Sequence, residues 1–281
     1  MLNHDLTREL ATAIDRMPAF PKSVQRILAL SQESRPTPRE LAQVIEKDPV
    51  LTVRVLKVVN SAYFRLPKQI NSIGHAVVYL GFNATKNLAI GMAAIGMLPD
   101  DNAAGFNWHE YLLHSLATAG IAKQLAARIG DAEPTDCFVA GLLHDFGKVV
   151  LARFMPTQLQ SALAISRANN GSLHLAIRNV LGADHAMVGA MLVVRWRFAP
   201  SLVETVRHQY DPEPQDTGMI ACVFAANQIS KQLKFGDGGN PFVSELPPAV
   251  TRRVGGSLEQ LILSLGDLGP MFEEAKQFSQ I

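Results

Sequence analysis

Apolar residues recur at helical spacing along this chain, and helix-start signals precede several of the runs. Residues 37–40 (Thr-Pro-Arg-Glu) combine an N-cap threonine, a proline at the first helical position and a glutamate three residues after the cap. Asp48-Pro49 begins the next helix in the same way. That helix is rich in valine, but its proline start and the near-helical spacing of Arg54 and Lys57 favour a helix over a strand. We therefore predict an all-α protein.

The same signals predict the other helices. We expect Ser72 to cap a short helix that ends at Gly81, and Asn83 to cap another that runs to about Met97. Further helices are expected at about 107–129, 135–145, 148–168, 173–181, 184–198, 200–208, 217–233 and from 257 to the end.

Two segments rich in glycine, proline or aspartate are predicted to be loops, and they divide the chain. Residues 99–105 (Pro-Asp-Asp-Asn-Ala-Ala-Gly) form the clearest loop of the first half, and residues 236–248 form the second. We expect an N-terminal helical lobe over 1–100, a helical core over 105–235, and a loop with a C-terminal helical extension over 236–281.

Composition and charge exclude several classes of protein. The 281 residues are 48% hydrophobic, and 26 basic side chains nearly balance 25 acidic ones without a basic block. Nothing therefore indicates binding to nucleic acid or to an anionic membrane. The apolar run 88–98 is roughly half of a bilayer span, and the N-terminus lacks the pattern of a signal peptide. Cys137 and Cys222 lie in apolar helical runs, which is typical of a reducing compartment. We expect a soluble cytoplasmic protein.

The strongest chemical signal is the segment 141–148 (Gly-Leu-Leu-His-Asp-Phe-Gly-Lys). His144 and Asp145 are adjacent there, and an imidazole beside a carboxylate is half of a site for one or two divalent cations. Metal-bound water is the usual route to phosphate-ester hydrolysis. Asp145 could instead cap the helix that begins near Gly147, and we expect Lys148 to be a surface lysine rather than a phosphate contact.

Helical spacing indicates which other polar side chains could join this pair. Glu110 and His114 are four residues apart and share a helix face. His185 and Asn227 lie on apolar stripes, and His208 ends its helix. Taken singly, a histidine on an apolar face is usually a satisfied core residue, and Glu110 is more often solvated. Together these groups could converge between helices, as metal ligands do in helical bundles.

Two sets of motifs, one in each half of the chain, resemble the HDOD family, the HD-related output domain of bacterial signalling proteins. The resemblance covers about residues 20–212 and rests on Phe20-Pro21, 48–51, 60–62, 70–73, Leu80-Gly81, His114-Ser115, 139–148 and 185–196. It implies an N-terminal helical lobe packed on an HD-like helical core. It also implies a role in signal transduction or regulation, often without demonstrated catalysis.

The resemblance to the wider HD superfamily implies a metal site in the order His, His-Asp, Asp. His114 and the pair 144–145 match the first two elements, and Asn227 stands where the last aspartate is expected. Because asparagine offers one neutral oxygen, we expect one divalent ion (Fe, Mn, Mg or Zn) rather than two. We expect His114, His144 and Asp145 to hold it, with help from His185 or His208.

The HD-GYP branch, whose members are cyclic-dinucleotide phosphodiesterases, adds a glutamate and further histidines, which Glu110, His185 and His208 resemble. Two departures count against that activity. Gln209 replaces the second histidine of a pair, and residues 210–214 (Tyr-Asp-Pro-Glu-Pro) lack the glycine-tyrosine-proline loop.

We therefore expect a signalling module that is non-catalytic or weakly catalytic, binds a metal or a small ligand such as a nucleotide, and meets a protein partner through its N-terminal lobe. The alternative is a metal-dependent phosphohydrolase that acts on a nucleotide or cyclic dinucleotide. A third hypothesis is a structural scaffold in which the polar groups satisfy one another.

Overall fold

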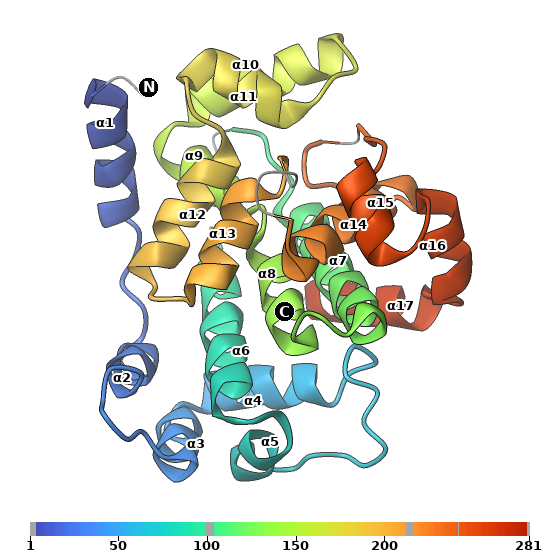
Figure 1. Cartoon of the computed structure of the whole chain (residues 1–281). Helices are drawn as coiled ribbons and strands as arrows, with labels where there is room; N and C mark the ends of the chain where they lie inside the picture. The colour runs from blue at the N-terminus through green and yellow to red at the C-terminus, as the bar shows by residue number, and fades with distance from the viewer. Residues whose placement is uncertain (1–3, 99–103, 212–215, 241, 280–281) are drawn as a thin grey trace. The chain divides into compact units, whose positions relative to one another are not determined.

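The computed structural model describes residues 4–98, 104–211, 216–240 and 242–279, and side chains from residue 8 to residue 278. Within these ranges the chain is helical and contains no strand (Figure 1). The all-α prediction is thus confirmed. The chain divides into two compact units, residues 18–98 and residues 1–17 with 99–281.

The smaller unit, residues 18–98, consists of short helices that begin at local caps. Thr37 forms the predicted capping box with Glu40, and the Asp48 side chain accepts a hydrogen bond from the Leu51 amide at 3.0 Å. Ser72 caps the helix that ends before Gly81, as predicted. The helices are α2 (Lys22–Leu30), α3 (Pro38–Glu46), α4 (Pro49–Val59), α5 (Ile73–Leu80) and α6 (Phe82–Ile95).

The larger unit is built around three helices that are buried on nearly all sides: α7 (Trp108–Ile129), α8 (Pro134–Leu143) and α14 (Gly218–Gln232). Figure 1 shows them side by side. A helix surrounded by others needs apolar residues all round rather than one stripe. The remaining helices are α1 (His4–Asp15), α9 (Phe146–Phe154), α10 (Pro156–Ala168), α11 (Leu173–Leu181), α12 (His185–Arg195), α13 (Pro200–His208), α15 (Pro248–Val254), α16 (Leu258–Leu265) and α17 (Gly269–Ser279).

Three expected helix boundaries were wrong. Gly81, with φ 84°, precedes α6, and Asn83 lies inside the first turn instead of capping it. The expected helix 148–168 is two helices that meet at Met155 and Pro156, because proline cannot continue an existing helix. The C-terminal region contains α15, α16 and α17 instead of one helical piece. Most of the expected loop 99–105 lies outside the described residues.

The first helix belongs to the larger unit, where α1 packs on α9 and α12, although the sequence placed residues 1–17 in the N-terminal lobe. The C-terminal helices belong to the same unit, since α15 packs on α14 and α17 packs on α7. Among the described residues, no single helix has the length and apolarity to cross a membrane. The pair α11 and α12, bent by 83°, meets those criteria only when the two are joined.

Glycines allow the helices that carry the His-Asp pair to approach their neighbours closely. A Cβ on Gly141 in α8 would lie 2.8 Å from the Ala119 Cα in α7. A Cβ on Gly147 in α9 would lie 1.9 Å from the His185 carbonyl oxygen at the start of α12. Because no other residue fits at these crossings, the two glycines bring α7 and α12 against the segment that contains His144 and Asp145.

Candidate metal centre

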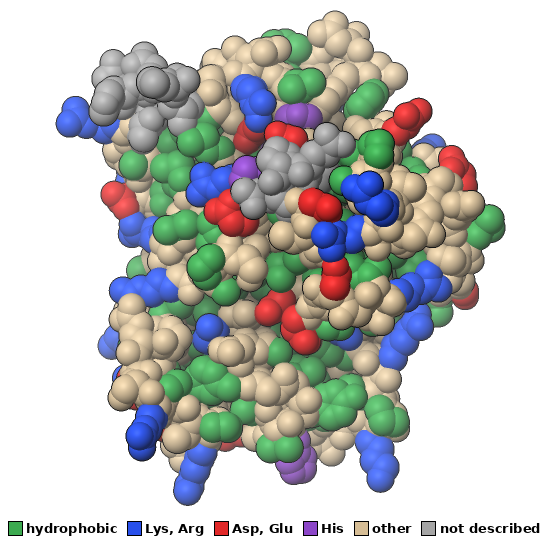
Figure 2. Space-filling model, viewed as in Figure 1, with side chains coloured by type: hydrophobic (Ala, Val, Ile, Leu, Met, Phe, Trp, Pro, Cys, Tyr) green, Lys and Arg blue, Asp and Glu red, His purple; other side chains and the backbone are tan. Residues whose placement is uncertain are grey.

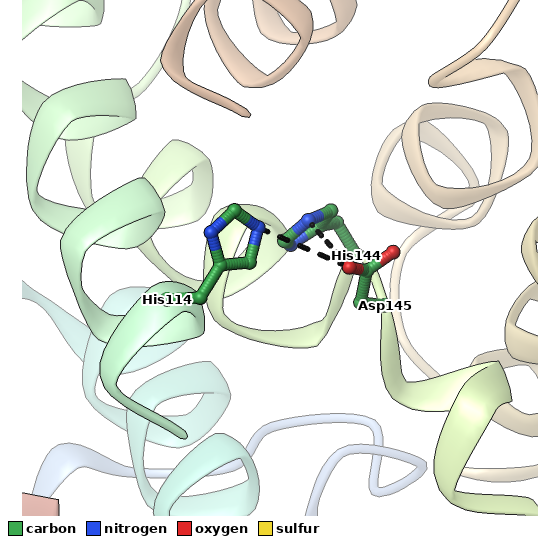
Figure 3. Close-up of side chains that lie close together, drawn as sticks. All are labelled: His114, His144 and Asp145. Carbon is green, nitrogen blue, oxygen red and sulfur yellow. Dashed lines mark ion pairs between the residues drawn. The ribbon is translucent and has the colours of Figure 1, made fainter. Parts of the chain in front are cut away.

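His114, His144 and Asp145 form a buried cluster that could hold a metal ion (Figure 3). His114 lies in α7, His144 ends α8, and Asp145 precedes α9. The Nε2 atoms of His144 and His114 lie 3.3 Å and 3.9 Å from Asp145 Oδ2, and no side chain of the three is more than 2% exposed. Two imidazoles and a carboxylate are the donors that Fe, Mn and Zn take in proteins.

The hydrogen bonds of His144 determine which of its ring nitrogens faces the cluster. Its Nδ1 lies 2.6 Å from the Gly141 carbonyl oxygen, which can only accept, so Nδ1 carries the proton. Nε2 is then the ring nitrogen that faces Asp145 Oδ2, at 3.3 Å. A ring nitrogen and a carboxylate oxygen at this distance need a proton or a cation between them.

Two buried ring nitrogens of the cluster make no hydrogen bond to described residues. Within the described part of the chain, neither His114 Nε2 nor His144 Nε2 has a hydrogen-bond partner. Buried polar atoms are rarely left in this state. The interpretation of Asp145 as a helix cap is wrong, because its side chain makes no capping hydrogen bond to α9. These observations fit a metal-ligand set.

Lys148 is buried, and the expectation of a surface lysine was wrong. Its Nζ lies 2.5 Å from Asp145 Oδ2 and 2.7 Å from the Gly238 carbonyl oxygen. The ammonium thus contacts the same carboxylate oxygen that His144 and His114 face. The cluster already contains one positive charge.

The other oxygen of Asp145 faces His185 and Tyr210. His185 Nε2 lies 3.0 Å from Asp145 Oδ1 and 3.0 Å from the Tyr210 hydroxyl, which itself lies 3.4 Å from Oδ1. The Tyr210 ring stacks on His174 at 4.2 Å between centroids, and its hydroxyl interacts with the Asn227 side chain. His185 and Asn227, both expected at the site, therefore lie on the Tyr210 side of the carboxylate.

Burial sets the protonation of the cluster. Burial lowers the pKa of His114 well below its usual value, and the neighbouring His144 adds to this effect. Burial and the Lys148 ammonium also lower the pKa of His185. Burial alone would raise the pKa of Asp145, but His144 and Lys148 hold it well below its usual range. A neutral His114 imidazole beside an ionised carboxylate is in the state that binds cations.

A segment after α14 lies directly on the cluster. The Asp237 amide donates to the Glu110 carbonyl oxygen at 3.1 Å. A Cβ on Gly236 would lie 2.4 Å from the His114 amide nitrogen. A Cβ on Gly238 would lie 2.8 Å from His114 Cδ2 and 3.0 Å from Asp145 Oδ2. We call residues 236–240 the strap, because it covers the cluster by backbone contact.

Other residues expected at the site are not in the metal group. The His208 side chain is 25% exposed, and its Nε2 lies 3.1 Å from Glu204 Oε2. Glu110 contacts the strap through its carbonyl oxygen, and its partly exposed carboxylate is not part of the metal group. Gln209, in place of a histidine, donates from Nε2 to the His144 carbonyl oxygen and supports the backbone there.

Sequence reasoning missed Tyr210, the strap and Lys231. Lys231 follows Asn227 by one helical turn, so spacing could have found it. Burial and the nearby Lys148 lower its pKa to about 7, and its Nζ lies 5.9 Å from the Tyr210 ring centroid. No sequence signal linked the strap to a site 90 residues earlier.

Comparison with known sequences shows the family to which the chain belongs. A sequence model of the HDOD domain matches residues 17–212, and the chain belongs to this family, which confirms the resemblance. An uncharacterized protein of Treponema pallidum (strain Nichols) is 28% identical over 84% of this chain and 46% of its own length. The uncharacterized YuxH of Bacillus subtilis (strain 168) is 28% identical over 40% of this chain and 27% of its own. The chain thus spans less than half of these curated relatives.

Solved structures share the architecture. An HDOD domain protein of unknown function from Geobacter sulfurreducens is 27% identical with a TM-score of 0.75, and the match covers 98% of this chain and 96% of that one. A Shewanella amazonensis SB2B protein, named provisionally as a phosphohydrolase, is 24% identical with a TM-score of 0.73, covering 96% and 97%. At that identity the second likeness shows the fold alone.

Proposed function

We propose that this chain is a regulatory module of bacterial signal transduction whose HD-type site holds one divalent ion or a small anionic ligand such as a nucleotide, and hydrolyses phosphate esters weakly or not at all. The observation that carries the proposal is the Lys148 ammonium on Asp145 Oδ2. It is supported by Asn227, which stands where the resemblance to the HD superfamily leads one to expect an aspartate. The proposed module meets a protein partner.

Charge supports one ion rather than two. Asp145 is the only carboxylate in the metal group found among the described residues, and Lys148 already neutralises it. A dication about 4 Å from an ammonium is repelled by on the order of 8 kcal/mol at an effective dielectric constant of 20. One ion would therefore need Lys148 to move or lose its proton, and a second would have no further carboxylate in this group.

The residues present fit a single metal. His114, His144 and Asp145 would hold it, since the two orphaned Nε2 atoms and the carboxylate face one another. A bound ion would supply Lewis acidity toward a phosphate oxygen. Lys148, as the cation nearest the cluster, would contact such an anion if it left Asp145. The strap covers the cluster, so a ligand that contacts Lys148 would have to displace it. The buried free thiols of Cys137 and Cys222 favour a reducing compartment such as the cytoplasm.

Elemental analysis tests the proposal. Protein purified without chelators should contain at most one equivalent of Fe, Mn, Mg or Zn, and His144→Ala should remove it. The same samples should show little or no turnover of bis(p-nitrophenyl) phosphate, cyclic dinucleotides and nucleotides. Two equivalents of metal, with turnover abolished by His144→Ala, would instead establish the second candidate, a metal-dependent phosphohydrolase. The orphaned Nε2 atoms favour that candidate. A site that holds no metal after reconstitution and binds no nucleotide would indicate a scaffold.

A further inference from the structure

The smaller unit is strongly basic although the whole chain is nearly neutral. Residues 18–98 contain ten lysines and arginines and four acidic residues, a net charge of +6, while the rest of the chain carries −5. Figure 2 shows blue side chains projecting around α3 with few red ones beside them. Such a surface attracts acidic partners over a Debye length.

Most of the few acids in this unit are engaged locally. Glu40 forms the capping box with Thr37, and Asp48 caps α4 and accepts from Ser23 at 2.6 Å. Glu33 pairs with Arg26 at 2.9 Å. Glu46, at the end of α3, is the remaining acid. The ten basic side chains outnumber these four acids, so the unit presents a net positive charge to a partner.

An apolar groove of about 430 Å³ lies between α3 and α5 in this basic unit. Val78 in the groove is 82% exposed, and the adjacent Tyr79 is 59% exposed. Water-exposed apolar side chains beside a concave surface are typical of protein-binding sites. The groove is lined mainly by Pro38, Arg39, Ala42, Glu46, Gly74 and Val78.

The groove runs along two turns of α3. Arg39, Ala42 and Glu46 follow one face of α3 over two turns, about 10 Å. Gly74 and Val78 lie one turn apart on α5. A Cβ on Gly74 would meet only Ser72 Oγ, at 4.0 Å, so this side of the groove is open.

We propose that this groove binds an amphipathic helix of a protein partner, with its apolar face on Val78 and Ala42 and acidic residues toward Arg39 and the surrounding basic side chains. The proposal rests on the proposed signalling function, because it names the surface that meets the partner. Nucleic acid fits less well, since its phosphates would leave the apolar side chains of Val78 and Ala42 without an apolar partner. A lipid surface is flat and cannot fill a concave groove.

Peptide binding tests the groove. The probe is a synthetic amphipathic helix of about four turns, with a leucine and alanine face and glutamate flanks, measured by fluorescence anisotropy on the full chain. The same peptide with lysine flanks is the charge control. We expect the glutamate peptide alone to bind, with a Kd that rises at least about tenfold in Val78→Glu and in Arg39→Glu. Leu263→Glu, on a side chain that is also 82% exposed but lies in the other unit, should leave the Kd unchanged.

Two other probes separate the alternatives. Preference for phosphatidylglycerol-containing vesicles or for a DNA duplex, with no peptide binding, would overturn the proposal, and so would equal binding by Val78→Glu and the native chain. Metal content and phosphodiesterase turnover, measured on the same samples, distinguish a failure of the groove proposal from a failure of the proposed function. High turnover would refute the proposed function whether or not the peptide binds. Absence of peptide binding would refute the groove proposal alone.

Discussion

Lys148→Met tests whether the Lys148 ammonium competes with a metal ion for Asp145. The two side chains are in contact at 2.5 Å and are at most 1% exposed. Removing one member of such a buried pair costs about 3–5 kcal/mol, because the other charge is left uncompensated. The substitution also removes a repulsion on the order of 8 kcal/mol between the ammonium and a bound dication. We expect the variant to unfold more easily in chelator but to bind metal at least about tenfold more tightly.

Urea unfolding followed by circular dichroism, in EDTA and in Mn²⁺ or Zn²⁺, measures both effects. An ion at 100 times its Kd should restore about 2.7 kcal/mol to the free energy of unfolding of the variant. The double variant Lys148→Met with His144→Ala is the control, and metal should not raise its free energy of unfolding. If Lys148→Met were as stable as the native chain in EDTA and bound no more metal, the competition between ammonium and ion would be refuted.

Three further substitutions test the architecture of the site. Gly147→Ala places a Cβ 1.9 Å from a carbonyl oxygen of α12, so it should lower the free energy of unfolding, measured in urea, by about 3 kcal/mol. The control is Gly171→Ala, whose Cβ would make only ordinary contacts at 3.8 Å and should change this free energy by less than about 0.5 kcal/mol. Gly238→Ala should displace the strap from His114 and speed hydrogen exchange of the amides of residues 236–240, and unchanged protection would contradict the close contact. Burial and a neighbouring histidine lower the pKa of His174 to about 4. On acidification the unfolded chain therefore takes up a proton first, and the free energy of unfolding should fall between about pH 6.5 and pH 4. His174→Phe keeps an aromatic ring and should reduce this pH dependence, and an unchanged pH profile would refute the role of His174.

Helix starts were predictable because their causes are local. Thr37, Asp48, Ser72 and Thr217 each accept a hydrogen bond from an amide three residues later, and such bonds depend only on neighbouring residues. The wrong start at Asn83 arose because a glycine with positive φ, not a polar side chain, made the turn. Pro156 was visible in the sequence, and the continuous helix expected across it ignored a local rule.

The His144-Asp145 pair and the family were also readable from the sequence. Adjacent residues stay together in any fold, and the motifs before and after the pair have characteristic spacing. Helical periodicity placed His185 and Asn227 inward, and both are buried. Helical periodicity did not show that His208 is partly exposed. His208 is the last residue of a short helix, where a rotation of about 100° between successive residues decides whether a side chain faces the core or the solvent.

By itself, therefore, the sequence determined the helical class, most helix starts, the family and the chemical identity of the central pair. Only the tertiary structure decided what surrounds that pair. Lys148 contacts a carbonyl 90 residues away, Tyr210 reaches back 65 residues to Asp145, and the strap lies on His114 from the end of α14. These contacts depend on how α7, α9, α12 and α14 pack, and periodicity along one helix carries no information about the helix opposite. The same packing turned an apparent surface lysine into the buried cation on which the proposed function depends.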